Sequence, residues 1–282
     1  MGQRIGGCSM EITRVEQYIL EVFRSIKTAA PNICATELHC EGWLLRLVLA
    51  AWSNGIGCPP FSLVPGSRWF AAPLLYSAFL AERRGDTFAE THSEADAVVG
   101  HFEFGSTKTG VRLTRSASQF VVLEAKVFSA LGAGTKNAPE YDQAARMVGC
   151  MAETLRRVGR PLDQYQSLSF FVLAPEKEIQ KGRFSKQIDP SHIRDVIKQR
   201  CLLYPAEARQ QELRAWLEAW VCPLTETLQL GCVSWEDIIR RIIVADKDFG
   251  LEIQRFYEDC LRYNGPNRGI PIPGQPFSVL PV

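Results

Sequence analysis

Apolar residues near the start of the chain recur every three or four positions. Over residues 10–27 this spacing predicts an amphipathic helix. The strongly apolar stretch 36–52 predicts a second helix, with Glu41 in its first half. The aromatic-rich stretch 67–84 predicts a third helix, kinked at Pro73 because proline cannot donate the backbone hydrogen bond that a helix needs there.

The pattern changes from helical to strand-like between residues 95 and 128. Residues 95–104 and 119–128 are apolar runs typical of buried strands, and residues 111–114 alternate between apolar and polar. A Gly-Ser-Thr-Lys turn at 105–108 separates the segment 95–104 from the segment 111–114. The sequence therefore predicts an antiparallel meander.

A helix and a further strand follow the meander. Residues 139–158 carry an apolar stripe at helical spacing, with Pro139 in the first turn. Residues 168–174 form a continuous apolar run, as expected of a buried strand. A strand, a helix and a strand in this order predict a right-handed parallel crossover.

The chain beyond residue 175 is expected to be mostly helical. The polar, lysine-rich stretch 176–186 is expected to be a surface loop. Four helices are predicted, at 190–202, 205–221, 234–246 and 249–263. The last residues, 264–282, hold five prolines and are expected to be extended.

These elements together predict an α/β fold with a mixed sheet flanked by helices. We expect one domain over residues 1–282 with its core at about 37–175. A helical C-terminal extension would cover about 176–263, followed by the Pro-rich tail at 264–282.

Composition narrows the class of protein. Of the 282 residues, 46% are hydrophobic and 22% are charged, which is typical of a globular chain. The net charge of +1 excludes a polybasic scaffold but is compatible with a nucleic-acid enzyme, because only the charge along the binding groove matters. None of the nine cysteines forms a C-x-x-C pair, which favours a reducing, cytoplasmic location. No apolar run has the length of a membrane span, so no membrane partner is expected.

The triplet Glu124-Ala125-Lys126 carries the clearest candidate chemistry. It is the one acid-x-Lys triplet in the chain, and it ends an apolar strand. Residues two apart in a strand share a face, so its carboxylate and ammonium leave the strand side by side. Asp96 stands at the start of the apolar run 97–100, which we expect to be a neighbouring strand. Two acids and a lysine at such a place can hold a divalent metal against a phosphate, although the same residues could also form a plain structural ion pair.

This order of elements and acids resembles the PD-(D/E)XK nuclease superfamily, which has the restriction-endonuclease-like fold. The matching residues are Asp96, the triplet 124–126, Glu41 on a helix before the sheet, and Gln143 on the helix after it. The phrases at 94–102, 124–129 and 141–146 are similar to an uncharacterised bacterial branch of that superfamily. Residue 95 is Ala where the motif name has Pro.

The resemblance implies a divalent-metal-dependent nuclease that hydrolyses phosphodiester bonds, with DNA favoured over RNA as the partner. Asp96, Glu124 and the carbonyl of Ala125 would bind Mg²⁺, for which Mn²⁺ can substitute. Lys126 would orient the attacking water or stabilise developing negative charge. Glu41 would hold outer waters or a second metal, and Gln143 would position the water or the phosphate. A homodimer is possible, since many such enzymes pair to cut two strands, but the oligomeric state stays open.

Several alternatives compete with these assignments. Glu41 and Gln143 could be ordinary surface residues of their helices. The histidines His92 and His101 could be metal ligands, but a polar role in the core or at the surface is favoured. The alternative to the nuclease is a non-catalytic nucleic-acid-binding or interaction module that retains the fold. A third hypothesis, an unrelated enzyme on another α/β fold, requires the acids to be coincidental.

A nuclease also needs basic residues along its groove. The candidates for phosphate contact are Lys108, Lys136, Arg146 and the basic residues of the stretch 177–186.

Overall fold

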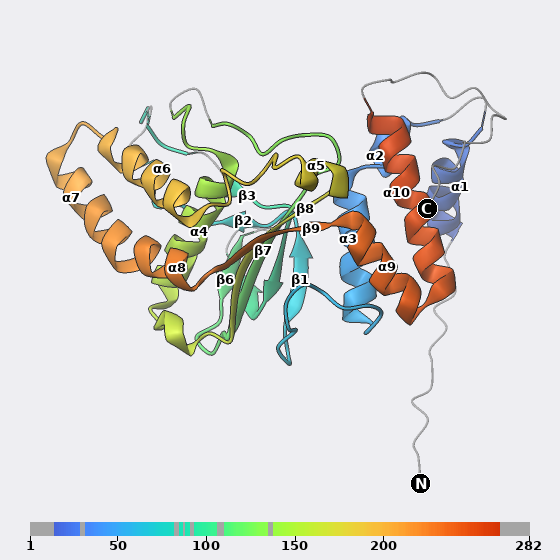
Figure 1. Ribbon diagram of the computed structural model, residues 1–282, viewed down its shortest axis with the longest axis horizontal. Coiled ribbons are helices and arrows are strands. Elements are labelled where there is room, and N and C mark those ends of the chain that lie inside the picture. The colour runs from blue at the N-terminus through green and yellow to red at the C-terminus, as the bar shows by residue number, and fades with distance from the viewer. Residues whose placement is uncertain are drawn as a thin grey trace, which may run out of the picture.

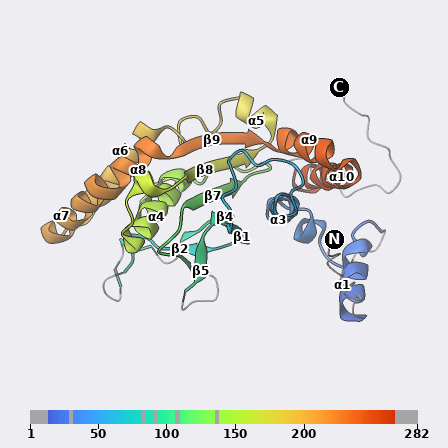
Figure 2. The same ribbon diagram turned by 90° about the horizontal axis from the view of Figure 1, so that it is seen from below.

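A five-stranded mixed sheet forms the centre of the protein. The computed structural model describes residues 14–28, 32–81, 85–86, 88–90, 93–105, 110–134 and 138–265. The strand order is β1-β4-β7-β8-β9, and Figure 2 shows these strands in succession. Their bounds are β1 Arg68–Ala71, β4 Ala97–Gly100, β7 Gln119–Ala125, β8 Ser167–Ala174 and β9 Gln229–Ser234. The mixed sheet expected from the sequence is confirmed.

Strand direction divides the sheet into two halves. β1, β4 and β7 pair antiparallel, whereas β7, β8 and β9 pair parallel. Two small antiparallel pairs accompany the sheet: β2 (Leu74–Leu75) with β3 (Ser93–Glu94), and β5 (Phe102–Phe104) with β6 (Val111–Leu113). The expected parallel crossover from β7 to β8 is present, and its connecting helix is α4 (Gln143–Val158).

Helices cover both faces of the sheet (Figure 1). One group of helices is α4, α6 (Pro190–Leu202), α7 (Glu207–Trp216) and α8 (Cys222–Thr227), with a π-helical turn at Leu217–Val221 between the last two. The group on the other side is α3 (Glu41–Ser53), α9 (Trp235–Ala245) and α10 (Lys247–Asn264). The remaining elements are α1 (Arg14–Ser25) and three short ones, α2 (Ala35–Leu38), α5 (Glu176–Gln180) and a 3-10 turn at Leu162–Gln164.

The alternation of side chains along β7 separates two hydrophobic cores. All seven residues of this strand are buried. Phe120 and Val122 join the core that contains α4, while Val121 and Leu123 join the core that contains α3. Successive residues of a strand point to opposite faces, so a strand with an apolar core on each side is apolar throughout. Glu124 interrupts that run on the α4 side.

The helix expected over residues 67–84 is wrong. Residues 68–71 form the edge strand β1, in which Trp69 pairs with Val99 of β4. Ala72 has a φ of 54°, and Pro73 follows it, so the chain turns sharply before β2. Aromatic residues are common in strands. The spacing of apolar residues over 67–84 does not by itself distinguish a helix from a strand, so the pairing with β4 decides the conformation.

The strand β9 was not expected from the sequence. It lies in the range assigned to the helical extension, yet it pairs with β8 over six residues, from Gln229 to Ser234. The chain beyond residue 175 therefore contributes one edge of the central sheet. Its residues are half-buried or exposed, so its sequence lacks the continuous apolar run of β7 and β8.

Other expected boundaries shift by a few residues. The helix expected over 36–52 is divided into α2 and α3 at His39 and Cys40. α4 begins at Gln143 rather than near Pro139, because the Asp142 side chain accepts a hydrogen bond from Ala145 N and caps the helix. The expected loop at 176–186 begins with α5.

Some expectations fall on residues that the structure does not describe. They concern His92, Lys108, Lys136, the first 13 residues and the tail beyond residue 265. Within the described ranges, no helix is both long enough and apolar enough to cross a membrane.

Candidate functional site

Asp96 and Glu124 lie opposite each other where β4 begins and β7 ends. Ala97 pairs with Leu123, and one step further along this antiparallel register Asp96 falls opposite Glu124. Asp96 Oδ2 accepts a hydrogen bond of 2.7 Å from the backbone N–H of Ala125. Directly opposed residues of an antiparallel pair share a face, so the two carboxylates are neighbours.

Lys126 lies close to both carboxylates. Its Nζ is 3.4 Å from Glu124 Oε2 and 3.7 Å from Asp96 Oδ2. The backbone of Lys126 is held on both sides: its N–H donates to Leu173 O at 2.8 Å, and its carbonyl accepts from Trp235 Nε1 at 2.9 Å. The lysine side chain therefore leaves from a fixed backbone rather than from a free loop.

Gln143 joins the site from the first turn of α4. Its Nε2 donates to Glu124 Oε2 at 2.6 Å. Its Oε1 accepts from the backbone N–H of Gly132 at 3.1 Å, and its own N–H donates to Gly132 O at 2.8 Å. The amide is thus held at both ends, with its donor directed at the carboxylate.

Glu41 is the first residue of α3, and its carboxyl bonds to the backbone of Val127, the residue after Lys126. Burial raises the pKa of its carboxyl, Lys126 lowers that pKa and Asp96 raises it again. A hydrogen bond with the backbone of Val127 favours the charged form. Glu41 thus lies near enough to feel both charges, but among the described residues it forms no three-acid group with Asp96 and Glu124. The structure brings Asp96, Glu124, Lys126 and Gln143 into direct contact around the Ala125 backbone.

Glu124 is the residue of this site whose charged form is least favoured by its surroundings. Its side chain is 0% exposed, and its pKa is raised well above the usual range by burial and then by the neighbouring Asp96 carboxylate, while Lys126 opposes this shift. Its Oε1 is buried and has no hydrogen-bond partner among the described residues. An unsatisfied buried acceptor beside a second carboxylate favours a proton or a cation at that place.

The donor set fits a small hard cation. Asp96 and Glu124 supply carboxylate oxygens, and the backbone of Ala125 lies beside them through its N–H bond to Asp96. Mg²⁺ is commonly held by one or two carboxylates and completed by water and substrate oxygens. Within the described ranges, no group of three or more His, Cys, Asp or Glu side chains is arranged to hold a metal ion, so an all-protein cage is absent there. Access is from the side of Asp96, whose side chain is 35% exposed.

Other expected candidates lie outside this arrangement. His101 Nε2 is 3.0 Å from Pro65 O, and its Nδ1 accepts from Ser118 N at 3.3 Å, so this histidine ties loops together, as favoured from the sequence. Lys181 and Arg183 both pair with Glu178, which reduces the charge that they offer to a phosphate. Arg146 has a buried Nε without a hydrogen-bond partner among the described residues.

Two supporting residues were not expected from the sequence. Asp142 caps α4, and its Oδ2 lies 2.9 Å from His192 Nε2 of α6, so it fixes the helix end that carries Gln143. An acid directly before a helical stretch is a recognisable capping signal, which could have identified Asp142. Nothing local marks Trp235, because its bond to the Lys126 carbonyl joins residues far apart in sequence.

No family model, curated protein or solved structure matches the chain. The resemblance to PD-(D/E)XK nucleases therefore stays a prediction that rests on the residues above.

Proposed function

We propose that the chain is a divalent-metal-dependent nuclease with a restriction-endonuclease-like fold. The observation that carries this proposal is the position of the Lys126 ammonium within 4 Å of two carboxylates, one of which keeps a buried oxygen without a partner. A structural ion pair would account for the lysine, but not for two crowded carboxylates with an unsatisfied oxygen. The mixed sheet flanked by helices is compatible with this fold.

Each residue has a role in the proposed reaction. Asp96 and Glu124 would hold Mg²⁺, or Mn²⁺ in its place, with the Ala125 carbonyl as a further ligand. The bound ion would supply positive charge to neutralise the phosphate and to lower the pKa of a bound water. Lys126 donates hydrogen bonds toward the attacking water or the non-bridging phosphate oxygens. Gln143 orients Glu124 through its hydrogen bond of 2.6 Å, and Glu41 adds negative charge that favours the cation.

The proposed substrate is nucleic acid. DNA is favoured over RNA by the family resemblance alone, which is an argument from analogy. A reducing location such as the cytoplasm is part of the proposal, because none of the nine cysteines forms a C-x-x-C pair.

Cleavage assays test the proposal. Purified protein with Mg²⁺ or Mn²⁺ is incubated with supercoiled, linear and single-stranded DNA and with RNA. We expect cleavage that EDTA stops, and that both Lys126→Ala and Asp96→Asn abolish. Undiminished cleavage by both folded variants would assign the activity to a contaminant.

A non-catalytic nucleic-acid-binding or interaction module is the second candidate. Apolar side chains on α1 and α3 support it, because Val15, Tyr18 and Trp43 are 67%, 60% and 38% exposed. A surface of this kind suits a protein partner or a second copy of the chain. Binding of duplex DNA without cleavage of any substrate in the panel would favour this candidate.

A further inference from the structure

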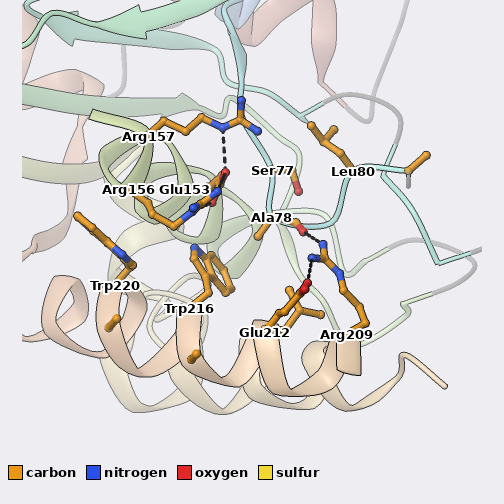
Figure 3. A pocket seen from close by; sticks show the side chains of 14 residues that line it. Ser77, Ala78, Leu80, Glu153, Arg156, Arg157, Arg209, Glu212, Trp216 and Trp220 are labelled. Carbon is orange, nitrogen blue, oxygen red and sulfur yellow. Dashed lines mark hydrogen bonds and ion pairs between the residues drawn. The ribbon is translucent and has the colours of Figure 1, made fainter. Parts of the chain in front are cut away.

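A cavity lies against the end of α4 opposite Gln143. Its volume is about 550 Å³, within the range of small-molecule sites. Figure 3 shows its two walls: Glu153, Arg156 and Arg157 on α4, and the indoles of Trp216 and Trp220 on the helical segment that faces them. None of the residues of the proposed nuclease site lines it.

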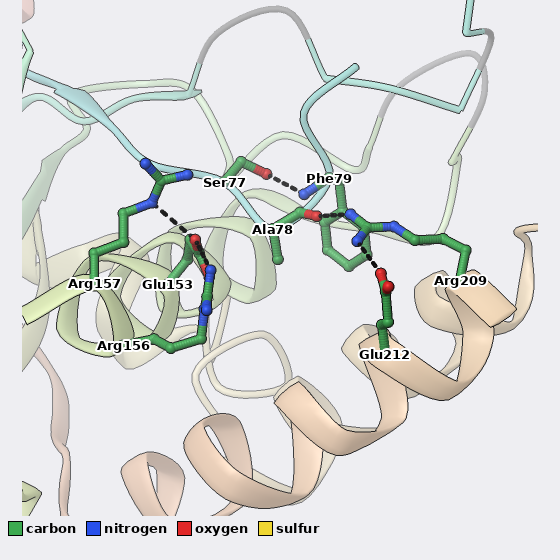
Figure 4. Close-up of polar contacts among 8 residues, drawn as sticks. All are labelled: Ser77, Ala78, Phe79, Glu153, Arg156, Arg157, Arg209 and Glu212. Carbon is green, nitrogen blue, oxygen red and sulfur yellow. Dashed lines mark hydrogen bonds and ion pairs between the residues drawn. The ribbon is translucent and has the colours of Figure 1, made fainter. Parts of the chain in front are cut away.

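The cavity carries an excess of positive charge. Three arginines line it, Arg156, Arg157 and Arg209, against two glutamates, Glu153 and Glu212. Arg209 is occupied, since it donates to Glu212 Oε2 at 2.9 Å and to the Ala78 carbonyl at 2.6 Å (Figure 4). The excess therefore lies on the α4 wall.

Two arginines on that wall share one buried carboxylate. Glu153 is 2% exposed and accepts from Arg156 Nε at 2.7 Å, from Arg156 Nη2 at 2.9 Å and from Arg157 Nε at 2.8 Å. In the described part of the chain, Arg157 forms hydrogen bonds only through Nε, and its guanidinium stacks 4.0 Å from the centre of the Tyr76 ring. Its two terminal NH₂ groups remain as donors in a fixed orientation, which suits a carboxylate or phosphate.

The opposite wall offers aromatic surface and an unsatisfied donor. Trp220 is half-buried at the cavity, and Trp216 is 7% exposed. Trp216 Nε1 is closed to solvent and has no hydrogen-bond partner among the described residues. An indole face stacks on any planar ring, whereas the Trp216 N–H would meet a ligand acceptor only after a shift of its side chain toward the cavity.

We propose that this cavity binds a nucleoside monophosphate, with the phosphate on Arg157 and Arg156 and the base against Trp220. The excess charge favours an anion, the half-buried indole of Trp220 favours a flat ring, and the volume of about 550 Å³ is enough for a single nucleotide. The proposal does not depend on the nuclease activity proposed above, because the two sites share no residue.

Isothermal titration calorimetry with AMP tests the assignment on the full chain. We expect a dissociation constant below about 1 mM, with adenosine and inorganic phosphate each at least about tenfold weaker, because each lacks one half of the recognised chemistry. AMP that binds no tighter than phosphate, or does not bind at about 5 mM, overturns the proposal.

Variants locate the binding. Arg157→Gln should weaken AMP binding by about tenfold, and it leaves Arg156 to satisfy Glu153. Arg241→Gln is the matched control, since the Arg241 side chain is 47% exposed against 39% for Arg157 and also pairs with an acid four residues before it. Trp220→Leu should weaken binding by about tenfold through lost stacking. Equal affinity in Arg157→Gln and wild type overturns the assignment.

Two further binding experiments distinguish a free nucleotide from a DNA strand as the ligand, and the cavity from the nuclease site as the place of binding. A DNA oligonucleotide that needs Arg157 for binding, while AMP does not bind, would assign the cavity to a strand and overturn the mononucleotide proposal. Glu124→Gln should leave AMP binding unchanged. A loss of AMP binding in that variant would place the nucleotide at the nuclease site instead.

Discussion

Asp96→Asn is expected to make the metal-free protein more stable while it destroys the proposed metal site. The substitution replaces one of two crowded carboxylates with an amide of the same shape. Its Oδ1 can still accept from Ala125 N, the bond that measures 2.7 Å in the wild type. Its new Nδ2–H₂ group can donate to the Glu124 Oε1 atom, which has no partner in the described part of the chain.

The magnitude follows from two opposing terms. A hydrogen bond to a charged acceptor contributes about 1.5–3 kcal/mol net. The lost ion pair with Lys126, at 3.7 Å and on a side chain that is 35% exposed, costs about 1 kcal/mol at most. The net stabilisation is therefore about 1–2 kcal/mol, or a rise in Tm of roughly 2–6 °C for a chain of this size.

Thermal unfolding followed by circular dichroism in EDTA at pH 7.5 measures this effect. Asp237→Asn is the matched control, because Asp237 is 31% exposed but pairs with Arg240 and Arg241 instead of facing a carboxylate. We expect its Tm to stay unchanged or fall slightly. A fall in the Tm of Asp96→Asn would refute the claim that the two carboxylates repel each other.

The pH dependence of that difference checks its cause. The pKa of Glu124 is raised in the folded protein, so the folded state binds this proton more tightly than the unfolded state does. The stability that the protonated Glu124 contributes is fully present below the pKa of an unfolded glutamate, about 4.3. It is lost as pH rises through the higher pKa that Glu124 has in the folded protein. The advantage of Asp96→Asn should therefore shrink as pH falls from 8 to 5. A constant difference over this range would assign the stabilisation to another group.

Three further outcomes are expected. Gln143→Leu should lower the single-turnover cleavage rate by about tenfold to a hundredfold, because it releases Glu124 from its orienting bond. It should also lower Tm, because the buried Glu124 carboxylate loses a hydrogen bond; an unchanged cleavage rate would remove Gln143 from the site. Affinity for duplex DNA, measured by fluorescence anisotropy, should fall steeply from low to physiological salt as counterion release is lost, and a salt-independent affinity would favour the interaction module. Gly100→Ala should lower the free energy of unfolding by about 3 kcal/mol in chemical denaturation, because at a φ of 152° the new Cβ would lie 2.1 Å from Gln119 O. Gly55→Ala is the control: Gly55 has a φ of 72° but open space around it, so this variant should lose only about 1 kcal/mol.

The local patterns predicted most of the sheet and the helices, and they failed where long-range pairing decides the structure. β7 and β8 are buried on both faces, so their sequences are continuous apolar runs that a single strand can reveal. β9 and β1 are edge strands with half-buried residues, and their conformation depends on partners that lie far away in sequence. The stretch 67–84 is an example: its apolar residues are compatible with a helix in isolation, but residues 68–71 pair with β4 in the folded chain.

The candidate site shows the same division. Glu124 and Lys126 could be placed together from the two-residue period of a strand, and Asp96 from the start of a neighbouring strand. Their pairing across β4 and β7, at the register that puts Asp96 opposite Glu124, needed the folded sheet. The hydrogen bonds of Gln143 to Glu124 and Gly132 depend on the rotation of α4, which is set by its Asp142 cap and by packing.

Direct binding of a divalent ion tests the central claim most simply. Mn²⁺ is titrated into the metal-free protein, and free Mn²⁺ is measured by electron paramagnetic resonance. We expect one ion bound for each wild-type chain, none for Asp96→Asn, and wild-type binding for Asp237→Asn. Equal binding by wild type and Asp96→Asn, or no binding by the wild type with or without DNA, would contradict a metal site at Asp96 and Glu124.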